Sequence, residues 1–451
     1  MLLGALATSA QGLDYAQALQ QAQEASGQVR NARLDVQAKD LKAQALSRLG
    51  APSVSITGFI GRVATSYNVD IHPVANVASQ LGALAPHLQI PQIPGTISGN
   101  HTFNLNSLGL SANWPIYTGG RLEALQGLEM GKLDEARAEA RDVEEKLSTT
   151  VAQRYFSLQL ASHAVRLRQA SVDGIAEHQH AATRLESVGL IATTERLKAD
   201  VALDSARRDL AKARSDAEIA RVALARLLNV SHVDSPSTPL FVHSSGIGSL
   251  QSFIDAGLAR NPAWDRISSK REQARQELKL QEGGSLPTVV AIANYNFNRS
   301  NEKLVQPNWA VGLLVSVPLI DRIDHNKMQA AALLDQQRVD ALEEQARRDV
   351  PTLIESHWRS MENAQAQFMS MDSTIRLARE SLRLQSVSFQ HGEATALYVT
   401  DAQLNLLKAE TERVQSAYEY VMALARLLEA SGQRLAELAG SADIQIALST
   451  E

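Results

Sequence analysis

The stretch that decides the fold is residues 133–147, which read LDEARAEARDVEEKL. Apolar residues recur in it at intervals of three and four, the spacing of a coiled-coil seam, at Leu133, Ala136, Ala140, Val143 and Leu147. The charged residues between them stand at helical ion-pair spacing, and we expect solvated pairs at Asp134–Arg137 and Asp142–Lys146. The pattern predicts a helix that packs along one face against other helices.

This helix is expected to be very long. No proline occurs between Pro115 and Pro236, and the helical pattern runs from Arg121 to Ser187, which gives about 100 Å at ~1.5 Å per residue. The second half of the chain has a similar seam, at Val339, Leu342, Ala346, Val350 and Leu353. A helix of this length cannot fold back into a small core, so it must lie side by side with others like it.

The chain is predicted to contain two copies of one plan. Pro115 corresponds to Pro318 and Gly189 to Gly392 at one constant offset of 203 residues (318 − 115). Each copy should contain a helix, a strand, a loop, a strand, a very long helix, a turn and a helix. The expected boundaries are a first repeat at 11–230, a linker at 231–249, a second repeat at 250–432 and a C-terminal tail at 433–451.

Alternation of apolar and polar residues predicts four strands. Their approximate ranges are 53–64, 108–116, 288–298 and 309–317. The first pair is separated by segment 69–100, which holds four prolines and is expected to be an exposed loop. Each strand is near the length that a tilted membrane strand needs, although a soluble antiparallel sheet fits the strands taken alone.

Four strands per chain have a consequence for assembly. The sequence lacks a stretch of 18 apolar residues, so strands are the expected membrane-crossing elements. Four strands cannot close a membrane barrel, and lipid does not tolerate an open sheet edge. We therefore expect several copies of the chain to contribute strands to one barrel.

Composition excludes several classes of protein. The formal net charge is −5 with both signs interspersed, so no nucleic-acid partner is indicated. The chain has no cysteine, no phosphate loop and no nucleophile motif, and we expect no enzyme activity, no cofactor and no metal site. His178 and His180 fall on different faces of a helix and are expected to be solvated. Residues 1–10 look like the remnant of a signal peptide, or else an ordinary terminus.

Three motifs carry a resemblance to a known family. They are Trp114 to Arg121 (WPIYTGGR) at a strand-to-helix junction, Val188 to Ala192 (VGLIA) at the first helical turn, and Ala259 to Pro262 (ARNP) in the second opening helix. In this order and spacing the chain resembles the TolC family of outer-membrane export channels over nearly its whole length. The second junction, residues 319–322, lacks the two glycines, so the match is better in the first half.

The resemblance implies an α+β membrane protein that forms a homotrimer. A 12-stranded β-barrel in outer-membrane lipid, four strands per chain, would be continued by a long α-helical barrel across the periplasm. Such a channel is the passive exit duct for an inner-membrane pump of the RND or ABC type, joined by a periplasmic adaptor protein. Multidrug efflux and type I protein secretion both remain open as the function. The alternative is a periplasmic coiled-coil scaffold without channel activity.

The resemblance also implies site residues. The helical turns would dock the adaptor, through Val188, Gly189, Leu190, His391, Gly392 and Glu393. The periplasmic gate would lie close by, at Thr194, Glu195, Phe389 and Asp401. Family members often have Tyr at Phe389 and Arg at Ala394, so the usual polar network cannot form in full here. A hydrophobic contact at Phe389 is expected to replace part of it.

Two further expectations concern charge and aromatic residues. Under threefold symmetry, Asp401 would form a ring of carboxylates around the tunnel axis, unless it pairs with Lys198 or another base on a neighbouring helix. Aromatic residues lie on or beside the predicted strands and form either a belt at the membrane boundary or the core of a sheet. They are Trp114, Tyr117, Tyr295, Phe297 and Trp309.

Overall fold

The computed structural model describes residues 12–84, 91, 93–244, 246–297, 308–320, 322–435 and 445–448. The chain divides into two compact units, each assembled from separate segments. The helical unit comprises Met1–Ala43, Gly127–Arg275 and Leu333–Glu451, and the strand unit comprises Gln44–Gln126 and Gln276–Ala332. The predicted signal-peptide remnant at residues 1–10 lies outside the described residues.

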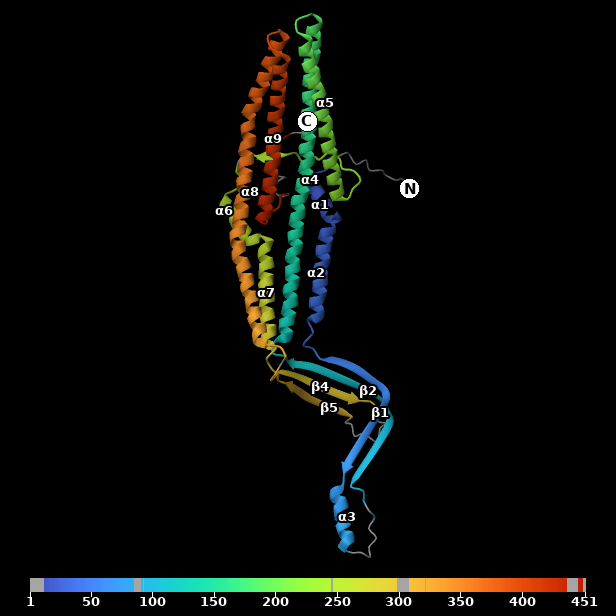
Figure 1. Cartoon of the computed structure of the whole chain (residues 1–451). Helices are drawn as coiled ribbons and strands as arrows, with labels where there is room; N and C mark the ends of the chain where they lie inside the picture. The colour runs from blue at the N-terminus through green and yellow to red at the C-terminus, as the bar shows by residue number, and fades with distance from the viewer. Residues whose placement is uncertain are drawn as a thin grey trace, which may run out of the picture. The chain divides into compact units, whose positions relative to one another are not determined.

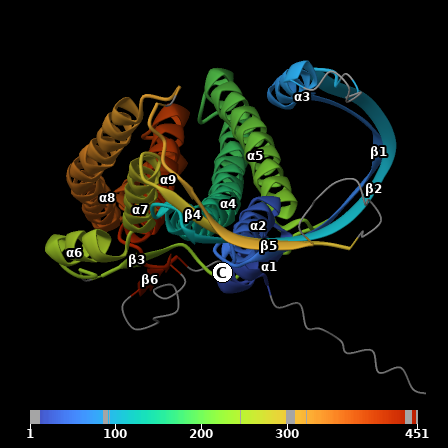
Figure 2. The ribbon, with the colours of Figure 1, turned by 90° about the horizontal axis from the view of Figure 1, so that it is seen from below.

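Helices and strands follow one another along the chain, with the labels shown in Figures 1 and 2. The elements are α1 (Tyr15–Ala25), α2 (Gly27–Leu46), β1 (Ser53–Asp70), α3 (His72–Leu84), β2 (Thr96–Tyr117), α4 (Arg121–Ser187), α5 (Thr193–Leu228), β3 (Phe241–His243), α6 (Leu250–Arg260), α7 (Pro262–Gly283), β4 (Thr288–Asn296), β5 (Trp309–Ser316), α8 (His325–Gln390), α9 (Ala396–Ala430) and β6 (Gln445–Ala447).

Two long helical hairpins dominate the helical unit. Helix α4 has 67 residues and α8 has 66, and each is followed by a shorter partner, α5 or α9, that lies beside it (Figures 1 and 2). The predicted long helix and its ion pairs are confirmed, with 3.1 Å between Arg137 and Asp134 and 2.7 Å between Lys146 and Asp142. No helix among the described residues is long and apolar enough to cross a membrane.

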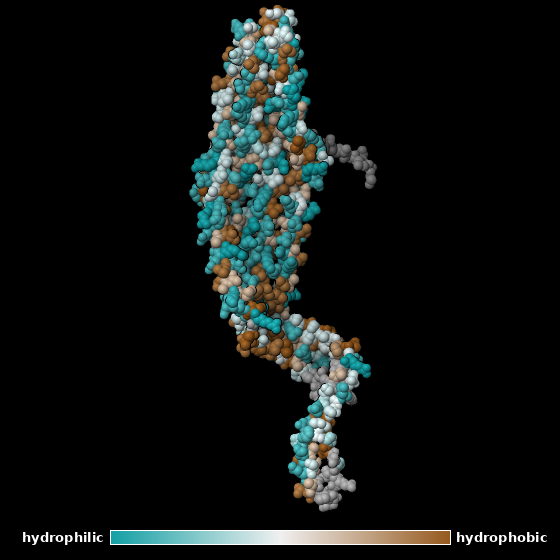
Figure 3. All heavy atoms as spheres, in the orientation of Figure 1, coloured by the Kyte–Doolittle hydropathy of each residue, from teal (hydrophilic) through white to brown (hydrophobic). Residues whose placement is uncertain are grey.

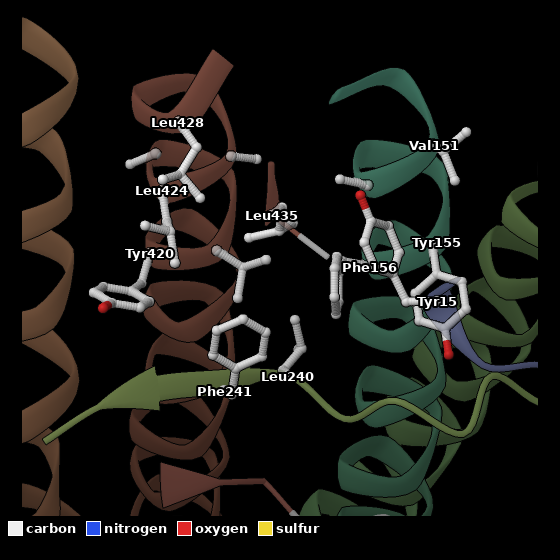
Figure 4. Packing of buried hydrophobic residues seen from close by; sticks show 14 of the residues in the cluster. Tyr15, Val151, Tyr155, Phe156, Leu240, Phe241, Tyr420, Leu424, Leu428 and Leu435 are labelled. Atoms are coloured by element: carbon white, nitrogen blue, oxygen red, sulfur yellow. The ribbon is translucent and has the colours of Figure 1, made fainter. Parts of the chain in front are cut away.

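An aromatic cluster holds the helical unit together midway along the hairpins (Figure 4). Tyr155 and Phe156 of α4 lie with ring centroids 5.2 Å apart, and Tyr15 of α1 packs on both. Phe241 of β3 contacts Phe156 at 6.1 Å and is almost fully buried. Segments far apart in sequence are therefore joined by one apolar core.

Described residues of the predicted linker, 231–249, and of the predicted tail, 433–451, form a small sheet. β3 lies in the first and pairs antiparallel with β6 in the second. The Tyr155 hydroxyl accepts a hydrogen bond from the Thr238 amide at 2.8 Å and donates one to the Leu13 carbonyl at 2.7 Å. A three-residue strand has little tendency to form alone, so β3 forms here because it is buried against the long helices.

Each opening helix was predicted as one continuous element and is broken into two. The Ser26 backbone is extended between α1 and α2, and its hydroxyl accepts from the Val29 amide at 3.2 Å. Between α6 and α7, the Asn261 side chain accepts from the Ala263 amide at 2.9 Å, ahead of a helix that begins at Pro262. Both breaks are made by side chains that cap the next helix.

The strand unit holds one antiparallel sheet in the order β1-β2-β4-β5. The predicted alternation is confirmed, because cross-strand partners share a face and that face is largely apolar. Ile56 lies opposite Leu110, Leu110 opposite Tyr295, and Tyr295 opposite Trp309. On β1 and β2 the opposite face carries more polar residues, including Ser55 paired with Ser111, whereas on β4 and β5 it also holds Val290, Ile292 and Leu314. Hydrophobic side chains are exposed on the strands (Figure 3).

Segment 69–100 differs from the loop that was expected. Strands β1 and β2 continue far beyond residues 64 and 108 to reach Asp70 and Thr96, and α3 occupies His72–Leu84 between them. The loop was predicted because prolines usually interrupt helices. Pro73, however, lies at the second residue of α3, where the backbone N–H has no partner within the helix and its absence does not destabilise the helix. Pro91 and Pro94 follow the helix and also leave it intact.

Candidate functional sites at the hairpin tips and on the sheet

Both hairpins turn through the same local structure. At the first tip, Gly189 has a φ of 74°, and its N–H donates to the Glu186 carbonyl at 2.9 Å. Leu190 N–H reaches back to the Leu185 carbonyl at 2.9 Å, which completes a Schellman cap. At the second tip Gly392 has a φ of 77°. Glycine adopts such positive φ values at the end of a helix more readily than other residues, which explains the residue type at both turns.

The six residues predicted to dock the adaptor are exposed at these tips. Val188 and Leu190 are 68% and 67% exposed, so the first tip presents two apolar side chains at its surface. A Cβ atom built on Gly189 or Gly392 would meet no atom within 4 Å. The turns therefore need glycine for its backbone conformation and not for lack of space.

Glu195 joins the two tips of one chain. Its Oε2 accepts a hydrogen bond from the Ala396 amide, the first N–H of α9, at 3.0 Å, and its Oε1 pairs with Lys198 at 2.7 Å. Thr395, at the N-cap position of α9, makes no capping bond with its own side chain. The first hairpin thus supplies the cap that the second hairpin lacks. The Lys198 hydrogen bond, helped by the Ala396 amide, lowers the pKa of Glu195.

Phe389 is buried inside the chain, 1% exposed, among residues from all four hairpin helices. His178 of α4 contacts it with ring centroids 4.3 Å apart and is itself 8% exposed, so the prediction of a solvated His178 was wrong. Burial lowers the pKa of His178, and the nearby Ala396 backbone opposes this shift only in part. The 3-4 spacing of Ile175, His178 and Ala182 continues the helix seam and could have revealed this.

The other two predicted gate residues lie on the surface of the single chain. Thr194 and Asp401 are both exposed, and the structure does not bring them into contact with Phe389. Asp401 has no ion pair within 4.0 Å in the part of the chain that the structure describes. Lys198, the partner considered for it, pairs with Glu195 instead. The four gate residues are thus divided between an internal contact and an exposed surface.

The five predicted belt residues gather on the apolar face of the sheet. Trp114 and Tyr117 lie opposite Ala291 and Val289 near one end of β4, and Tyr295 lies at its other end. The remaining two adjoin Tyr295, since Phe297 contacts its ring at 5.0 Å and Trp309 is its cross-strand partner. At ~3.4 Å per residue, the two groups are about 14–20 Å apart along the strand. All five side chains are exposed.

We expect the substitution Glu195→Ala to loosen the start of α9. Amide exchange at Ala396 should accelerate about fivefold, which corresponds to the ~1 kcal/mol typical of a lost N-terminal cap. Because the folded pKa is lowered, this stabilisation is complete above the ordinary pKa of 4.5 and is lost as the pH falls through the folded value. Hydrogen exchange by mass spectrometry would measure both effects.

Lys198→Ala serves as the control for this experiment. It removes the other partner of the Glu195 carboxylate and leaves the bond to Ala396 in place, so exchange at Ala396 should change little. If amide exchange at Ala396 in Glu195→Ala matched the parent rate, the Glu195 cap would not contribute to the stability of the start of α9.

Solved channel structures share this fold. The outer-membrane channel OprN superposes with a TM-score of 0.75 over 93% of this chain and 89% of its own, at 17% identity. The MtrE channel of Neisseria gonorrhoeae gives a TM-score of 0.74 over 93% and 89%, at 18% identity. CusC gives 0.74 over 93% and 92%, at 16% identity. The class of fold is therefore that of outer-membrane channels.

Sequence comparison identifies the family. The model of the family described as "Outer membrane efflux protein" matches residues 18–230 and 253–433, and the chain belongs to that family of channel proteins. The cobalt-zinc-cadmium resistance protein CzcC of Cupriavidus metallidurans is 25% identical over 307 residues, 66% of this chain and 70% of that protein. TolC of Vibrio cholerae is 21% identical over 316 residues, 66% and 72%. The predicted resemblance and outer-membrane location, extending into the periplasm, are confirmed.

Proposed function

We propose that this chain is the exit duct of a three-part export system and passively conducts substrates supplied by an inner-membrane pump. The observation that carries the proposal is the family match over both halves of the chain, at residues 18–230 and 253–433. A periplasmic adaptor protein would connect pump and duct. The exposed tip turns, centred on Gly189 and Gly392, are the surface proposed to meet the adaptor.

The duct is proposed to be a homotrimer with a 12-stranded barrel. Each chain offers four strands, and the outer edges of β1 and β5 have no partner in the described sheet. Because neighbours in the order β1-β2-β4-β5 are antiparallel, β5 of one copy would meet β1 of the next in antiparallel sense. The apolar face with its two aromatic levels suits a surface toward lipid.

The helical hairpins are proposed to form two repeats of an α-helical barrel. Helices α4 and α8 differ by one residue in length, as do α5 and α9, and both tips end in a glycine of positive φ. The gate would lie near the tips, where the Glu195 cap on α9 supports a closed arrangement within each chain. Phe389 contributes through its internal contact with His178.

Three classes of cargo are compatible with the proposed duct. Multidrug efflux through an RND pump and type I protein secretion through an ABC pump both fit a passive duct. The name of CzcC refers to cobalt, zinc and cadmium resistance, which adds metal cations as a third class. Among the described residues, no three His, Cys, Asp or Glu side chains gather where they could hold a metal ion.

A cysteine cross-link tests the assembly. The chain has no native cysteine, so Val54→Cys on β1 can be combined in turn with Val311→Cys, Leu313→Cys and Val315→Cys on β5. All four positions share the apolar face, and at least one pair should form a disulfide-linked series that ends at three chains. Ser55→Cys, on the opposite face, replaces Val54→Cys as the control and should not link.

Conduction tests the function itself. Purified protein added to a planar bilayer should open ion-conducting pores of one unit size. Protein that forms the cross-linked trimer and conducts no current would be a scaffold and not a duct, and the proposed function would be wrong.

A further inference from the structure

The β1–β2 hairpin projects beyond the rest of the sheet. β2 pairs with β4 only from Gly109 to Tyr117, whereas β1 and β2 continue to pair with each other from Phe59↔Ser107 to Asp70↔Thr96. At ~3.3 Å per residue this two-stranded ribbon is about 36 Å long. In the described part of the chain, no third strand pairs with it. A two-stranded ribbon is at best marginally stable alone in water, so the ribbon needs a partner.

Helix α3, at the end of the ribbon, has an uncovered apolar stripe. Four aliphatic side chains recur along it at intervals of three, four and three residues, each at least 54% exposed, at Val74, Val77, Leu81 and Leu84. This is the spacing of positions a and d in a coiled coil. The ribbon that carries the helix also exposes Ile60, at 88%. An apolar surface of this kind calls for an apolar occupant.

The scarcity of charged residues around α3 limits which kind of partner can cover its apolar stripe. Between Arg62 and Arg121 the sequence has no Lys or Arg, and Asp70 is its one acidic residue. Amphipathic helices that lie on lipid surfaces are usually rich in Lys and Arg, which α3 lacks entirely. A strongly charged partner would find no complementary charge. The surface fits another uncharged, aliphatic helix, and further copies of α3 are such helices.

The position of the ribbon at the edge of the sheet brings the α3 helices of neighbouring copies close to one another in the proposed trimer. β1 is an edge strand, and its outer edge is where the next copy joins in the proposed trimer. The ribbon continues that edge outward, so each copy carries its ribbon along the same boundary. Tethering to one barrel raises the effective concentration of the three helices for one another, which compensates for the shortness of a 13-residue helix.

We propose that the three α3 helices of a trimer pack through Val74, Val77, Leu81 and Leu84 into one three-helix bundle, which holds the three β1–β2 ribbons together. This inference rests on the proposed trimer. Three equivalent helices in mutual contact must surround the threefold axis, and that axis is also the axis of the duct. The bundle therefore lies across the outer mouth of the barrel, and cargo leaves between the ribbons.

Single cysteines in the full-length protein test the bundle. Leu81→Cys places a thiol in the stripe, and Ser79→Cys places one about 200° away around the same helix. Mild copper-phenanthroline oxidation should link Leu81→Cys chains into dimers. Because only two of three thiols around an axis can pair, the yield should approach about two thirds of the chains. Ser79→Cys should give several-fold less.

Two further measurements make the result decisive. If the barrel pair of Val54→Cys with a β5 cysteine links into trimers while Leu81→Cys stays monomeric, the bundle is overturned and the proposed duct stands. If neither links, the trimer itself fails. A polarity-sensitive fluorophore on Leu81→Cys should be shielded from brominated lipid in vesicles, and strong quenching there would assign the stripe to the membrane and overturn the bundle.

Discussion

Replacing Gly392 or Gly189 by isoleucine should abolish export while the protein still reaches the outer membrane. Each glycine has a φ near 75°, where an ordinary L-residue costs roughly 1–2 kcal/mol and a β-branched one more. The turn would relieve this strain by rearranging its cap, which includes a 2.8 Å bond from the Glu393 amide to the Ser388 carbonyl. The bulky side chain would also stand on the surface proposed to meet the adaptor.

Asparagine at the same positions is the matched control. It tolerates positive φ better than other side-chain-bearing residues and should preserve the turn, so Gly392→Asn should retain most export. Gly432, also of positive φ, provides a contrasting site, because a Cβ there would lie 2.9 Å from the Arg260 carbonyl oxygen inside the fold. Gly432→Ile should therefore lower the yield of folded protein, which the tip variants should not do.

Export would be measured as survival on a transported drug or as secretion of a transported protein, with surface labelling to report the amount of channel. Full export by both isoleucine variants at normal channel levels would remove the docking role of the tips. Loss of export together with loss of the protein would show a folding defect and would equally count against that role.

Neutralising Asp401 should remove block of the channel by trivalent cations. Asp401 is exposed on α9, and the base considered for it, Lys198, is occupied by Glu195 at 2.7 Å. Threefold symmetry would place three such carboxylates around one axis, and like charges held together attract multivalent cations. Tyr398, one turn earlier and 57% exposed, adds no second ring of charge.

The measurement is single-channel current with hexaamminecobalt(III) added on the periplasmic side. Asp401→Asn should raise the half-blocking concentration about tenfold or more, equivalent to ~1.4 kcal/mol of binding free energy. Asp216→Asn is the control, since Asp216 is an exposed acid on α5 that already pairs with Lys212 at 2.8 Å. Equal block of Asp401→Asn and the parent would mean that Asp401 is an ordinary surface charge.

Much of the framework follows from local sequence. The seam around Leu133 and Val143, without an interrupting proline, is sufficient to predict α4, because helical periodicity and backbone propensity are local properties. The alternation around Leu110 predicts the apolar face of the sheet for the same reason. The two tip glycines were also predictable, since a positive φ at a helix end restricts the residue type at one position.

Tertiary structure alone decided the features that depend on distant partners. β3 exists because Phe241 is buried against Phe156, and its pairing with β6 joins segments about 200 residues apart (445 − 243). The spacing of His178 and His180 correctly predicted different faces, yet only the position of α8 determines that Phe389 covers His178. Periodicity gives the direction of a side chain along its own helix, and burial requires knowledge of what lies opposite.

Glu195 is the clearest example, within the candidate site, of a residue whose role depends on the tertiary structure. From the sequence, it is an acidic residue in the first turn of α5, where it favours its own helix. In the structure its carboxylate caps α9, 201 residues further along the chain. The sequence by itself determined the helices, the strands and the turns, because these follow from neighbouring residues. The tertiary structure decided which of their ends meet, because that depends on the packing of whole hairpins.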